Sequence, residues 1–443
     1  MATAKSSGQQ LPEVRTPVPG PKSRELGARL AQIESPSVDA RRESRARETG
    51  REMAPIVYES GLGANVVDVD GNRYVDLAAG FGALLLGHAP AVVVRALEAQ
   101  AGKLSLALGD VFGSGEKLAL CERLAALLPE PGARVMLGSS GADAVTAAIK
   151  TAALATGKPG IVAFDGAYHG LSHGPLAACG LRPSFREPFA GQLNAHVTFA
   201  PYPGQAATLR RSIEAVRAAL ARGDIGCVLV EPVLGRGGCI DPPAELLPEL
   251  RRACDDTGAL LAVDEIWTGL GRSGAWLASV EAGVIPDVVC VGKGLGGGMP
   301  VSACIGRSSA MAAWGAHGGT TIHTATHFGA PLGCAAALAT LDAIHAHGLV
   351  ARARDVGDRW MSRLRQRTEG RGVTAVRGRG LMVGVVIEGG AAGALDVTRR
   401  LLERGWIVLT GGSAADTLTL TPPLDIDEAL LDAFVDVLAD ALS

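Results

Sequence analysis

A lysine set among glycines is the residue of this sequence that most clearly invites a chemical explanation. In PDVVCVGKGLGGGMP, residues 286–300, Lys293 follows a short apolar run and stands among five glycines between 292 and 298. A buried lysine almost always has a partner, and glycine at this density indicates close approach of the backbone or a positive φ. The stretch predicts a primary amine at the end of a buried strand, with Gly292 and Gly294 leaving room for a bound molecule and for movement of the lysine.

Acidic residues follow two other apolar runs. Glu231 comes after GCVLV, residues 226–230, and Asp264 comes after ALLAV, residues 259–263. A carboxylate at the end of a buried strand is costly unless it is paired. Asp264 is therefore a candidate metal ligand, one half of a structural ion pair, or the partner of a cationic ligand.

A serine–glycine turn follows the run ARVML, residues 133–137. The segment GSSGADAVTAAIKTA after it predicts a helix that begins near Gly141. Backbone N–H groups and the positive end of the helix would meet there and form an anion site, to which Ser139 and Ser140 can add hydroxyl groups. The alternative is an ordinary helix N-cap made by serine.

Tyrosine and histidine follow the run GIVAF, residues 160–164, in the segment DGAYHGLSHG. Tyr168 is one of only four tyrosines and suits stacking on a planar ring. His169 and His173 are four residues apart, which on a helix is a spacing for metal ligands, so a zinc site is the alternative interpretation. Glycines weaken such a helix, and no third ligand at a typical spacing is near. We therefore expect no metal site, and a histidine that is satisfied or lies beside the ring.

These residues need a scaffold that brings strand ends together. Apolar runs alternate with segments of helical pattern, which indicates an α/β fold with a mostly parallel sheet flanked by helices. In open α/β sheets, ligands bind outside the carboxyl ends of the strands, where all of these residues stand. The expected strands are 133–137, 160–164, 226–230, 259–263 and 287–291, and the expected helices are 91–104, 115–128, 141–156, 207–222, 245–257 and 331–347.

The strand ends thus present an anion site, an aromatic plate, a carboxylate and an amine, and pyridoxal 5′-phosphate (PLP) is a cofactor that requires all four. Its phosphate suits helix N-terminal amides, and its flat ring suits Tyr168. A buried carboxylate such as Asp264 keeps the ring nitrogen protonated. A desolvated Lys293 loses its proton readily enough to form a Schiff base with the aldehyde. The sequence therefore predicts a PLP enzyme.

The composition bounds the class of protein. The chain has 443 residues, 20% of them charged, and a formal net charge of −3, so nothing indicates nucleic acid or an anionic membrane as a partner. The eight cysteines include no CxxC pair, and several lie in apolar runs, which predicts buried free thiols. No secretory signal opens the chain, and no apolar stretch reaches membrane-spanning length. We expect a cytoplasmic protein with no membrane partner.

The chain divides into four parts by pattern. Residues 1–25 are polar and rich in proline and glycine, which predicts a flexible or loosely attached arm. Residues 26–90 are expected to form the N-terminal segment of a small domain; they contain the Arg/Glu run 39–52, which predicts a solvated helix face, and a hairpin in GANVVDVDGNRYVDL. Residues 91–335 predict the large PLP-binding domain. Residues 336–443 predict a linking helix and the C-terminal part of a small α+β domain.

Eight segments, taken in order, resemble the class III (ω-type) aminotransferases, a family that includes the 4-aminobutyrate and ornithine enzymes. They are GANVVDVDGNRYVDLAAG, GHAPAVVVRALEAQ, GSSGADAVTAAIKTA, AFDGAYHG, VEPVLGRGG, LLAVDEIWTGLGRSG, PDVVCVGKGLGGGMPVSACIGR and THFGAPLGCAAALATL. The resemblance covers roughly residues 56–443 and implies PLP fold type I, with the small domain built from the chain ends.

The resemblance implies an activity as well. An amino group would pass from an amine or ω-amino acid to an oxo-acid or aldehyde acceptor by a ping-pong mechanism. One alternative is another PLP reaction on the same scaffold, such as amino-acid racemisation or epimerisation, aminomutase chemistry or decarboxylation. A second alternative is a binding protein that retains the fold without the cofactor.

Roles for individual residues follow from the resemblance. Lys293 would be the catalytic Schiff-base lysine, and Asp264 would pair with the ring nitrogen. Thr326 would reach the phosphate of the neighbouring subunit, which implies a homodimer with shared active sites. The residues implied around the cofactor are Ser140, Gly141, Ala142, Tyr168, His169, Glu231, Asp264, Ile266, Lys293 and Thr326.

The chain departs from the family pattern in the expected substrate pocket. Thr419 stands where an arginine usually clamps an α-carboxylate, and loss of a guanidinium fork is not conservative. Arg236 stands where relatives have a glutamate, so either Arg236 takes over carboxylate recognition or the substrates differ from the usual 2-oxoglutarate and glutamate pair. Trp267 replaces a glutamine and narrows the pocket, and Phe81 adds apolar bulk.

Overall fold

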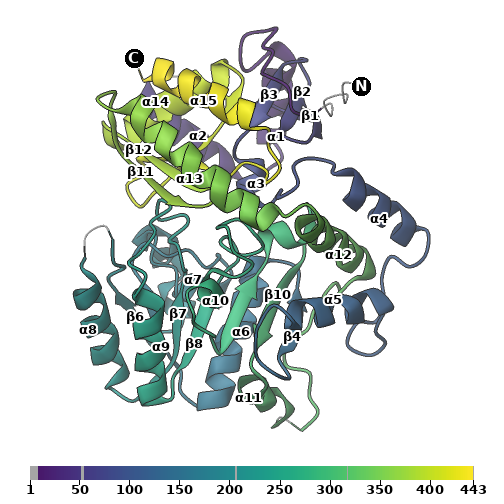
Figure 1. The fold of residues 1–443 in the computed structure, drawn as a ribbon, viewed down its shortest axis with the longest axis vertical. Coiled ribbons are helices and arrows are strands. Elements are labelled where there is room, and N and C mark those ends of the chain that lie inside the picture. Colours follow the sequence, from purple (N-terminus) through teal and green to yellow (C-terminus); the bar gives the residue numbers. More distant parts are fainter. Residues whose placement is uncertain (1–7, 51–53, 205–206, 317, 443) are drawn as a thin grey trace.

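The computed structural model describes residues 8–50, 54–204, 207–316 and 318–442, and these residues form three β-sheets (Figure 1). The largest sheet contains β4 (Arg134–Gly138), β10 (Ser302–Gly306), β9 (Val288–Val291), β8 (Leu260–Asp264), β7 (Ile225–Val230), β5 (Gly160–Phe164) and β6 (Val197–Ala200), in that order. Strands β9, β8, β7, β5 and β6 are parallel, whereas β10 runs antiparallel to both β9 and β4. The mostly parallel central sheet that the sequence predicts is confirmed.

Helices cover both faces of this sheet because side chains along each strand alternate between the faces. On β5, Ile161 and Ala163 pack with α6 (Gly141–Thr156). Val162 and Phe164 on the same strand face the opposite way and pack with α8 (Leu209–Leu220) and α9 (Leu246–Thr257). The remaining helices of this region are α4 (Ala91–Ala101), α5 (Gly115–Ala125), α7 (His173–Ala177), α10 (Ala278–Glu281), α11 (Ser308–Met311) and the short 3-10 helices η1 (Pro183–Phe185), η2 (Glu187–Gln192), η3 (Lys293–Gly296) and η4 (Ala312–Ala316).

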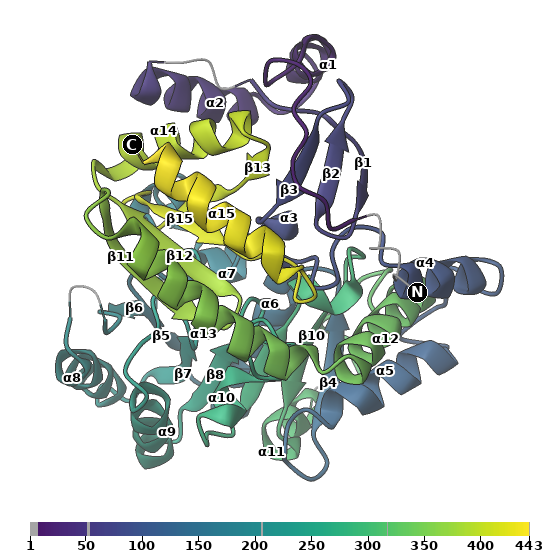
Figure 2. The same cartoon turned by 45° about the horizontal axis from the view of Figure 1, so that its top comes forward.

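The two chain ends build two further sheets beside the large one (Figure 2). One sheet has the order β1 (Tyr58–Leu62), β2 (Asn65–Asp68), β3 (Arg73–Asp76) and β13 (Trp406–Ile407), and the other has the order β11 (Val373–Arg379), β12 (Met382–Ile387), β15 (Thr417–Leu420) and β14 (Leu409–Gly411). The helices of this part are α1 (Pro21–Ala31), α2 (Pro36–Thr49), α3 (Ala79–Gly82), α13 (Leu349–Thr368), α14 (Gly390–Glu403) and α15 (Glu428–Ala441). Helix α12 (Pro331–Ala346) precedes α13 but packs on α4 and α5 beside the large sheet.

Long-range contacts join the N-terminal and C-terminal segments into one α+β unit. Strands β2 and β3 form the expected antiparallel hairpin, and β13 then pairs in parallel with β3. Helix α2 packs against α14, as Figure 2 shows. A small domain built from the chain ends is therefore present. The exact division of the chain stays a prediction, and the boundary predicted at residue 335 falls inside α12.

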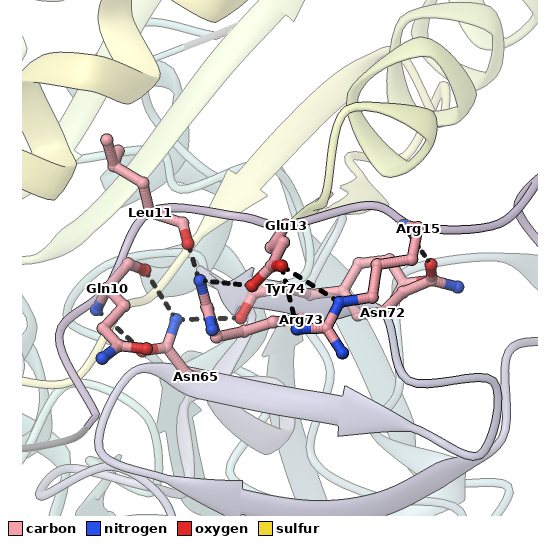
Figure 3. Close-up of polar contacts among 8 residues, drawn as sticks. All are labelled: Gln10, Leu11, Glu13, Arg15, Asn65, Asn72, Arg73 and Tyr74. Carbon is pink, nitrogen blue, oxygen red and sulfur yellow. Dashed lines mark hydrogen bonds and ion pairs between the residues drawn. The ribbon is translucent and has the colours of Figure 1, made fainter.

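The segment that precedes α1 lies along β3 (Figure 3). Gln10 N donates to Asn65 Oδ1 at 2.8 Å, and Asn65 Nδ2 donates to the carbonyl of Gln10 at 2.8 Å. Glu13 and Arg73 form an isolated antiparallel β-bridge, and their side chains form an ion pair at 3.1 Å. Residues 8–16 therefore differ from the loosely attached arm that their composition predicts, because the edge of the β1–β3 sheet supplies hydrogen-bond partners that no local pattern reveals.

Two further sequence expectations concern cysteines and membrane spans. All eight cysteines are free, and all except Cys121 are buried, as predicted. Among the described residues, no single helix is long and apolar enough to cross a membrane, and α12 and α13 pass that test only together, as a pair bent by 64°.

Candidate functional site

The carboxyl ends of the parallel strands meet at a cavity of about 260 Å³, which we call the cofactor cavity. It contains eight of the ten residues that the resemblance places around the cofactor. Gly170 and Leu171 also line it, and the sequence did not single them out. The full lining is Gly141, Ala142, Tyr168, His169, Gly170, Leu171, Glu231, Asp264, Ile266, Trp267 and Lys293.

A buried carboxylate–histidine pair lies in this cavity. His169 Nδ1 donates to Asp264 Oδ2 at 2.7 Å, and Ile266 N donates to Asp264 Oδ1 at 3.0 Å. Burial lowers the pKa of His169, but the hydrogen bond and negative charge of Asp264 more than offset this, so the pKa is raised. Among the described residues, His169 Nε2 is buried without a hydrogen-bond partner. Asp264 is thus held in a fixed orientation by hydrogen bonds to both of its carboxylate oxygens.

Glu231 forms a second buried carboxylate beside this pair. Its Oε1 accepts from Tyr168 N at 2.8 Å, and its Oε2 accepts from Gly235 N at 3.0 Å. Burial raises the pKa of Glu231 to about 6, against the opposing effect of the positive charge on His169. Glu231 therefore fixes the backbone that carries Tyr168 and adds negative charge near Asp264.

Lys293 follows β9 in a strained conformation. Its φ is +42°, in the left-handed region that side chains rarely adopt. Its Nζ lies 4.0 Å from the ring centroid of Trp267. Burial lowers the pKa of Lys293 to about 8, although the carboxylates of Asp264 and Glu231 act in the opposite direction. The amine is therefore available in neutral form at mildly alkaline pH.

The two glycines that flank Lys293 differ in what surrounds them. A Cβ on Gly294 would lie 2.3 Å from Leu85 Cδ1, so this glycine admits a side chain from the segment after α3. A Cβ on Gly292 would meet only ordinary contacts at 3.4 Å or more. The expectation that Gly294 makes room for a bound molecule is wrong, because the space is filled by Leu85.

The N-terminus of α6 lies at the cavity with its first two residues, Gly141 and Ala142, in the lining. Ser140 forms a capping box: its Oγ accepts from Asp143 N at 3.2 Å, and Asp143 Oδ2 accepts from Ser140 N at 2.8 Å. The interpretation of Ser140 as an N-cap is confirmed. Its hydroxyl is thus engaged in the helix cap, while the positive end of the helix still faces the cavity.

This lining does not include Ser139, Ser140, His173 or Thr326, which the sequence also singled out. Thr326 is exposed, and Ser140 stands one residue before the lining begins. His173 is hydrogen-bonded through Nε2 to Gln192 at 2.8 Å and does not join His169. The described part of the chain contains no group of three or more residues able to hold a metal ion.

A second cavity, of about 230 Å³, adjoins the first, and we call it the arginine cavity. Trp267 lines both. All four residues predicted for the substrate pocket line it. The lining is Val38, Arg41, Arg42, Arg45, Phe81, Arg236, Trp267, Leu409, Thr410, Gly411, Thr419 and Thr421. The interpretation of the run 39–52 as a solvated face holds for Arg41, which is exposed, but is wrong for Arg42 and Arg45, which are half-buried. Their spacing with Val38 (i, i+3, i+4, i+7) marks one helical face and is the signal that could have revealed them.

The indole of Trp267 stands where the two cavities meet. Gly82, with φ +79°, allows this approach, because a Cβ there would lie 2.3 Å from Trp267 Nε1. That Nε1 is buried without a hydrogen-bond partner among the described residues. A ligand that extends from Lys293 into the arginine cavity must therefore pass the indole.

The cofactor cavity fits pyridoxal phosphate by the chemistry of its groups. It offers a helix N-terminus for a phosphate, an aromatic ring at Tyr168, a fixed buried carboxylate at Asp264 and an amine at Lys293. The unpartnered His169 Nε2 adds a buried polar atom with hydrogen-bonding capacity to spare. These are the groups that the phosphate, ring, ring nitrogen and aldehyde of PLP require.

Comparison with known proteins gives a consistent picture. The family model described as aminotransferase class-III matches residues 46–442. The chain is 35% identical to the acetylornithine aminotransferase of Methanosarcina acetivorans over 387 residues, 87% of this chain and 92% of that protein. It is 37% identical to the acetylornithine aminotransferase of Mycobacterium bovis, over 86% of this chain and 90% of that protein.

Solved structures agree with the relatives in sequence. An amine transaminase from an uncultivated Pseudomonas species, in its PLP-bound form, superposes with a TM-score of 0.81 at 29% identity and covers 88% of this chain and 94% of its own. The ornithine aminotransferase of Toxoplasma gondii superposes with a TM-score of 0.80 at 27% identity and covers 94% of this chain and 97% of its own.

Proposed function

This chain belongs to the class III aminotransferases and uses pyridoxal phosphate to transfer amino groups, and from that premise we propose which of its residues perform the transfer. Lys293 would hold the cofactor through its aldehyde and would move the substrate proton, and Asp264 would pair with the ring nitrogen. Gly141 and Ala142 hold the phosphate through backbone N–H groups, and Tyr168 stacks on the ring. The observation that carries the proposal is that all five line one cavity of about 260 Å³.

Asp264 and His169 act together in this proposal. When bound, PLP supplies an aldehyde that captures an amine and a ring that withdraws electrons from the neighbouring carbon. Asp264 would face positive charge at the ring nitrogen, since its carboxylate is buried in the same cavity and fixed by a hydrogen bond from His169 at 2.7 Å. His169 orients the carboxylate from behind, as an outer hydrogen-bond partner orients a ligand residue elsewhere.

Lys293 carries the proton at its Nζ. With a pKa lowered to about 8, the amine exchanges its proton readily near neutral pH and suits both acceptance from a substrate carbon and return to it. The face of Trp267, 4.0 Å away, stabilises the ammonium form that results from acceptance. These contacts support Lys293 as the group that moves the proton in both half-reactions.

The experiment is a panel of amines, ω-amino acids and oxo acids, scored by the absorbance of the bound cofactor. We expect a donor amine alone to bleach the band, and an oxo acid or aldehyde to restore it, as two alternating half-reactions require. Racemisation of one enantiomer without bleaching would instead indicate another PLP reaction on this scaffold.

We also propose a homodimer in which Thr326 reaches the cofactor phosphate of the neighbouring subunit. Thr326 is exposed and stands outside the cavity of its own chain. Leu108, Val111 and Phe112 expose 63%, 67% and 68% of their surface, a density of apolar residues that marks an interaction surface. Light scattering should give the mass of a dimer, and Phe112→Asp should yield monomers with depleted PLP.

A cytoplasmic location is the remaining proposal. Its support is the set of eight free cysteines, since an oxidising compartment favours disulfides.

A further inference from the structure

The segment that carries Phe81 to the arginine cavity has an unusual backbone. Residues Ala79–Gly82 all have positive φ, between +42° and +79°. Ala79 and Phe81 have side chains, which disfavour this left-handed region. Phe81 lines the arginine cavity, and Gly82 leaves space for the indole of Trp267. A backbone of this kind persists only where surrounding contacts impose it.

A buried aspartate supplies such contacts to the N–H groups at the start of this turn. Asp76 is the last residue of β3 and is 3% exposed. Its Oδ1 accepts from Ala78 N and from Ala79 N, both at 2.9 Å. Its own backbone is fixed, because Asp76 N donates to the carbonyl of Ala64 at 2.8 Å. The carboxylate therefore ties the entrance of the turn to a strand whose position is set by the sheet.

A histidine and a threonine complete the support. His88 Nε2 donates to Asp76 Oδ2 at 2.9 Å, and the backbone of His88 forms a bridge with Gly63. Thr421 Oγ1 donates to the carbonyl of Ala78 at 3.1 Å, and Thr421 also lines the arginine cavity. Ala78 is thus hydrogen-bonded through both its N–H and its carbonyl, so the turn that follows it is held in one orientation beside the cavity.

We propose that Asp76, supported by His88, is a positioning residue that limits the width of the donor substrate, because it holds Phe81 at the wall of the arginine cavity. This rests on the proposed function, with the part of the donor beyond the amine at Lys293 lying in that cavity. Asp76 and His88 themselves are not part of the lining of either cavity, so their effect on the substrate passes through the turn.

The kinetic test uses two amines with the same number of carbons, heptylamine and the wider cyclohexylmethylamine. We expect the wild-type enzyme to prefer heptylamine. Asp76→Ala should lower the ratio of the two kcat/KM values ~10-fold or more, the range for a single methylene in an apolar pocket. Asp76→Asn keeps an acceptor for the two backbone N–H groups and should restore most of the ratio.

A double variant shows whether the effect passes through Phe81. Phe81→Ala should lower the ratio by itself, and adding Asp76→Ala should change the ratio no further, because residues that act through one contact are not additive. His88→Ala keeps the carboxylate but removes its support, and it should lower the ratio by a smaller factor. This variant serves where Asp76→Ala does not yield folded enzyme.

Asp68 provides the matched control. It is also buried, and it accepts from the backbone of Asp70 at 3.0 Å and of Asn72 at 2.9 Å, with Tyr74 OH at 2.7 Å. It supports the turn between β2 and β3 and is not part of the lining of the arginine cavity. Asp68→Ala leaves two buried N–H groups without their acceptor, as Asp76→Ala does, so both should unfold at lower urea concentration. Only Asp76→Ala should change the donor ratio.

A structural measurement separates this inference from the proposed function because it needs no substrate. Crystal structures of the PLP-loaded variants should show Phe81 at a negative φ and away from the cavity wall in Asp76→Ala, and at its wild-type position in Asp68→Ala.

Each outcome decides for or against the positioning role. Phe81 unmoved in Asp76→Ala, equal losses of the ratio in Asp76→Ala and Asp68→Ala, a further loss in the double variant, or a wild-type enzyme without preference for heptylamine overturns it and leaves the transferase function standing. A displaced Phe81 in Asp76→Ala alone, in an enzyme that transfers from no donor, supports the positioning role and overturns the assigned catalytic roles.

Discussion

The cofactor cavity and the arginine cavity share the indole of Trp267 but are built from different parts of the chain. The first collects residues that stand at the carboxyl ends of β5, β7, β8 and β9 of one sheet or within a few residues after them, together with the start of α6. The second collects α2, α3, β14 and β15, which lie near opposite chain ends, together with Arg236 from the loop after β7. Sheet topology therefore determines the position of the cofactor cavity, whereas contacts between segments far apart in the sequence form the arginine cavity.

The two cavities also differ in how their charges are balanced. In the cofactor cavity, Asp264 is paired with His169, and Glu231 accepts two backbone N–H groups. In the arginine cavity, Arg41 and Arg236 lack a carboxylate among the described residues. A site whose polar groups satisfy one another is preorganised for a resident molecule. The arginine cavity is more open to water, which solvates the exposed Arg41, so its positive charge does not need a fixed partner within the protein.

The largest effect should come from the amine of the cofactor cavity. By the proposed roles, Lys293→Ala removes both the residue that bonds to the cofactor and the group that moves the proton, so we expect a loss of more than ~10⁴-fold in turnover. The measurement is a coupled assay with the best donor and acceptor pair from the panel. Circular dichroism and PLP titration serve as controls for folding. Retention of about 1% of the activity would show that another group can move the proton. The proposed role of Lys293 in proton transfer would then be wrong.

The next largest effect should come from Asp264, whose carboxylate is paired with His169. Asp264→Asn keeps the shape but removes the charge that faces His169 and, by the proposed role, the ring nitrogen. We expect turnover to fall ~10²- to 10³-fold, as for a broken buried pair. PLP should remain bound, with its absorbance maximum shifted.

A matched control for this substitution exists at the other end of the same sheet. Asp287 is also buried, and it accepts from Arg251 at 2.6 Å and from Leu261 N at 2.8 Å. Asp287→Asn should lower stability while the folded enzyme keeps its turnover. Equal losses of turnover in the two variants would show that Asp264 acts only through the fold.

A smaller effect should appear in the pH dependence of stability through Glu231. Its pKa is raised from 4.5 to about 6, so between these values the folded state binds more protons than the unfolded state, and stability falls as pH rises. Above pH 6 the cost is about 2 kcal/mol at one pKa unit per 1.36 kcal/mol. Glu231→Gln does not ionise there, so its stability relative to wild type should rise between pH 4.5 and 7. Urea unfolding at both pH values measures this, and a constant difference contradicts the raised pKa.

The same contrast between the two cavities explains which residues of the site could be predicted from the sequence. Lys293, Asp264 and Tyr168 each follow their own strand within a few residues, and a rule about strand ends brings them together without further information. Strand β6 was missed because it is a four-residue strand at the sheet edge with a partly exposed pattern. Arg41 was missed because a periodic pattern predicts which residues share a helix face, but it does not predict which other part of the protein that face will contact.

Two local patterns had more than one meaning. A serine before a helix can serve as an N-cap or as an anion ligand. In the structure, the Ser140 hydroxyl accepts a hydrogen bond from Asp143 N and so serves as an N-cap. Gly294 signalled close approach correctly, but the approaching group is Leu85, which is far away in sequence. In both cases the pattern fixed the local conformation and tertiary contacts decided the partner.

The smallest effect should come from the arginine cavity, through backbone strain at Phe81. Residues Ala79 to Gly82 all have positive φ, and Phe81, with φ +61° and ψ +35°, is 57% exposed. A side chain in this left-handed region costs about 1–2 kcal/mol, whereas glycine adopts it without strain. Because the exposed ring loses little contact, Phe81→Gly should raise stability by ~0.5–1 kcal/mol after the greater chain entropy of glycine is counted.

A matched substitution decides whether strain is the cause. Phe189 is 43% exposed and lies in η2 without a positive φ, so Phe189→Gly should lower stability by ~0.5–1 kcal/mol. Urea unfolding of both variants gives the sign of each change. Opposite signs would mean that the backbone beside the arginine cavity is strained in order to hold Phe81 at the cavity wall. The stabilised Phe81→Gly enzyme should then discriminate less among bulky donors. If both variants lose stability, the left-handed turn costs nothing measurable, and the position of Phe81 follows from the packing of Trp267 on Gly82 instead.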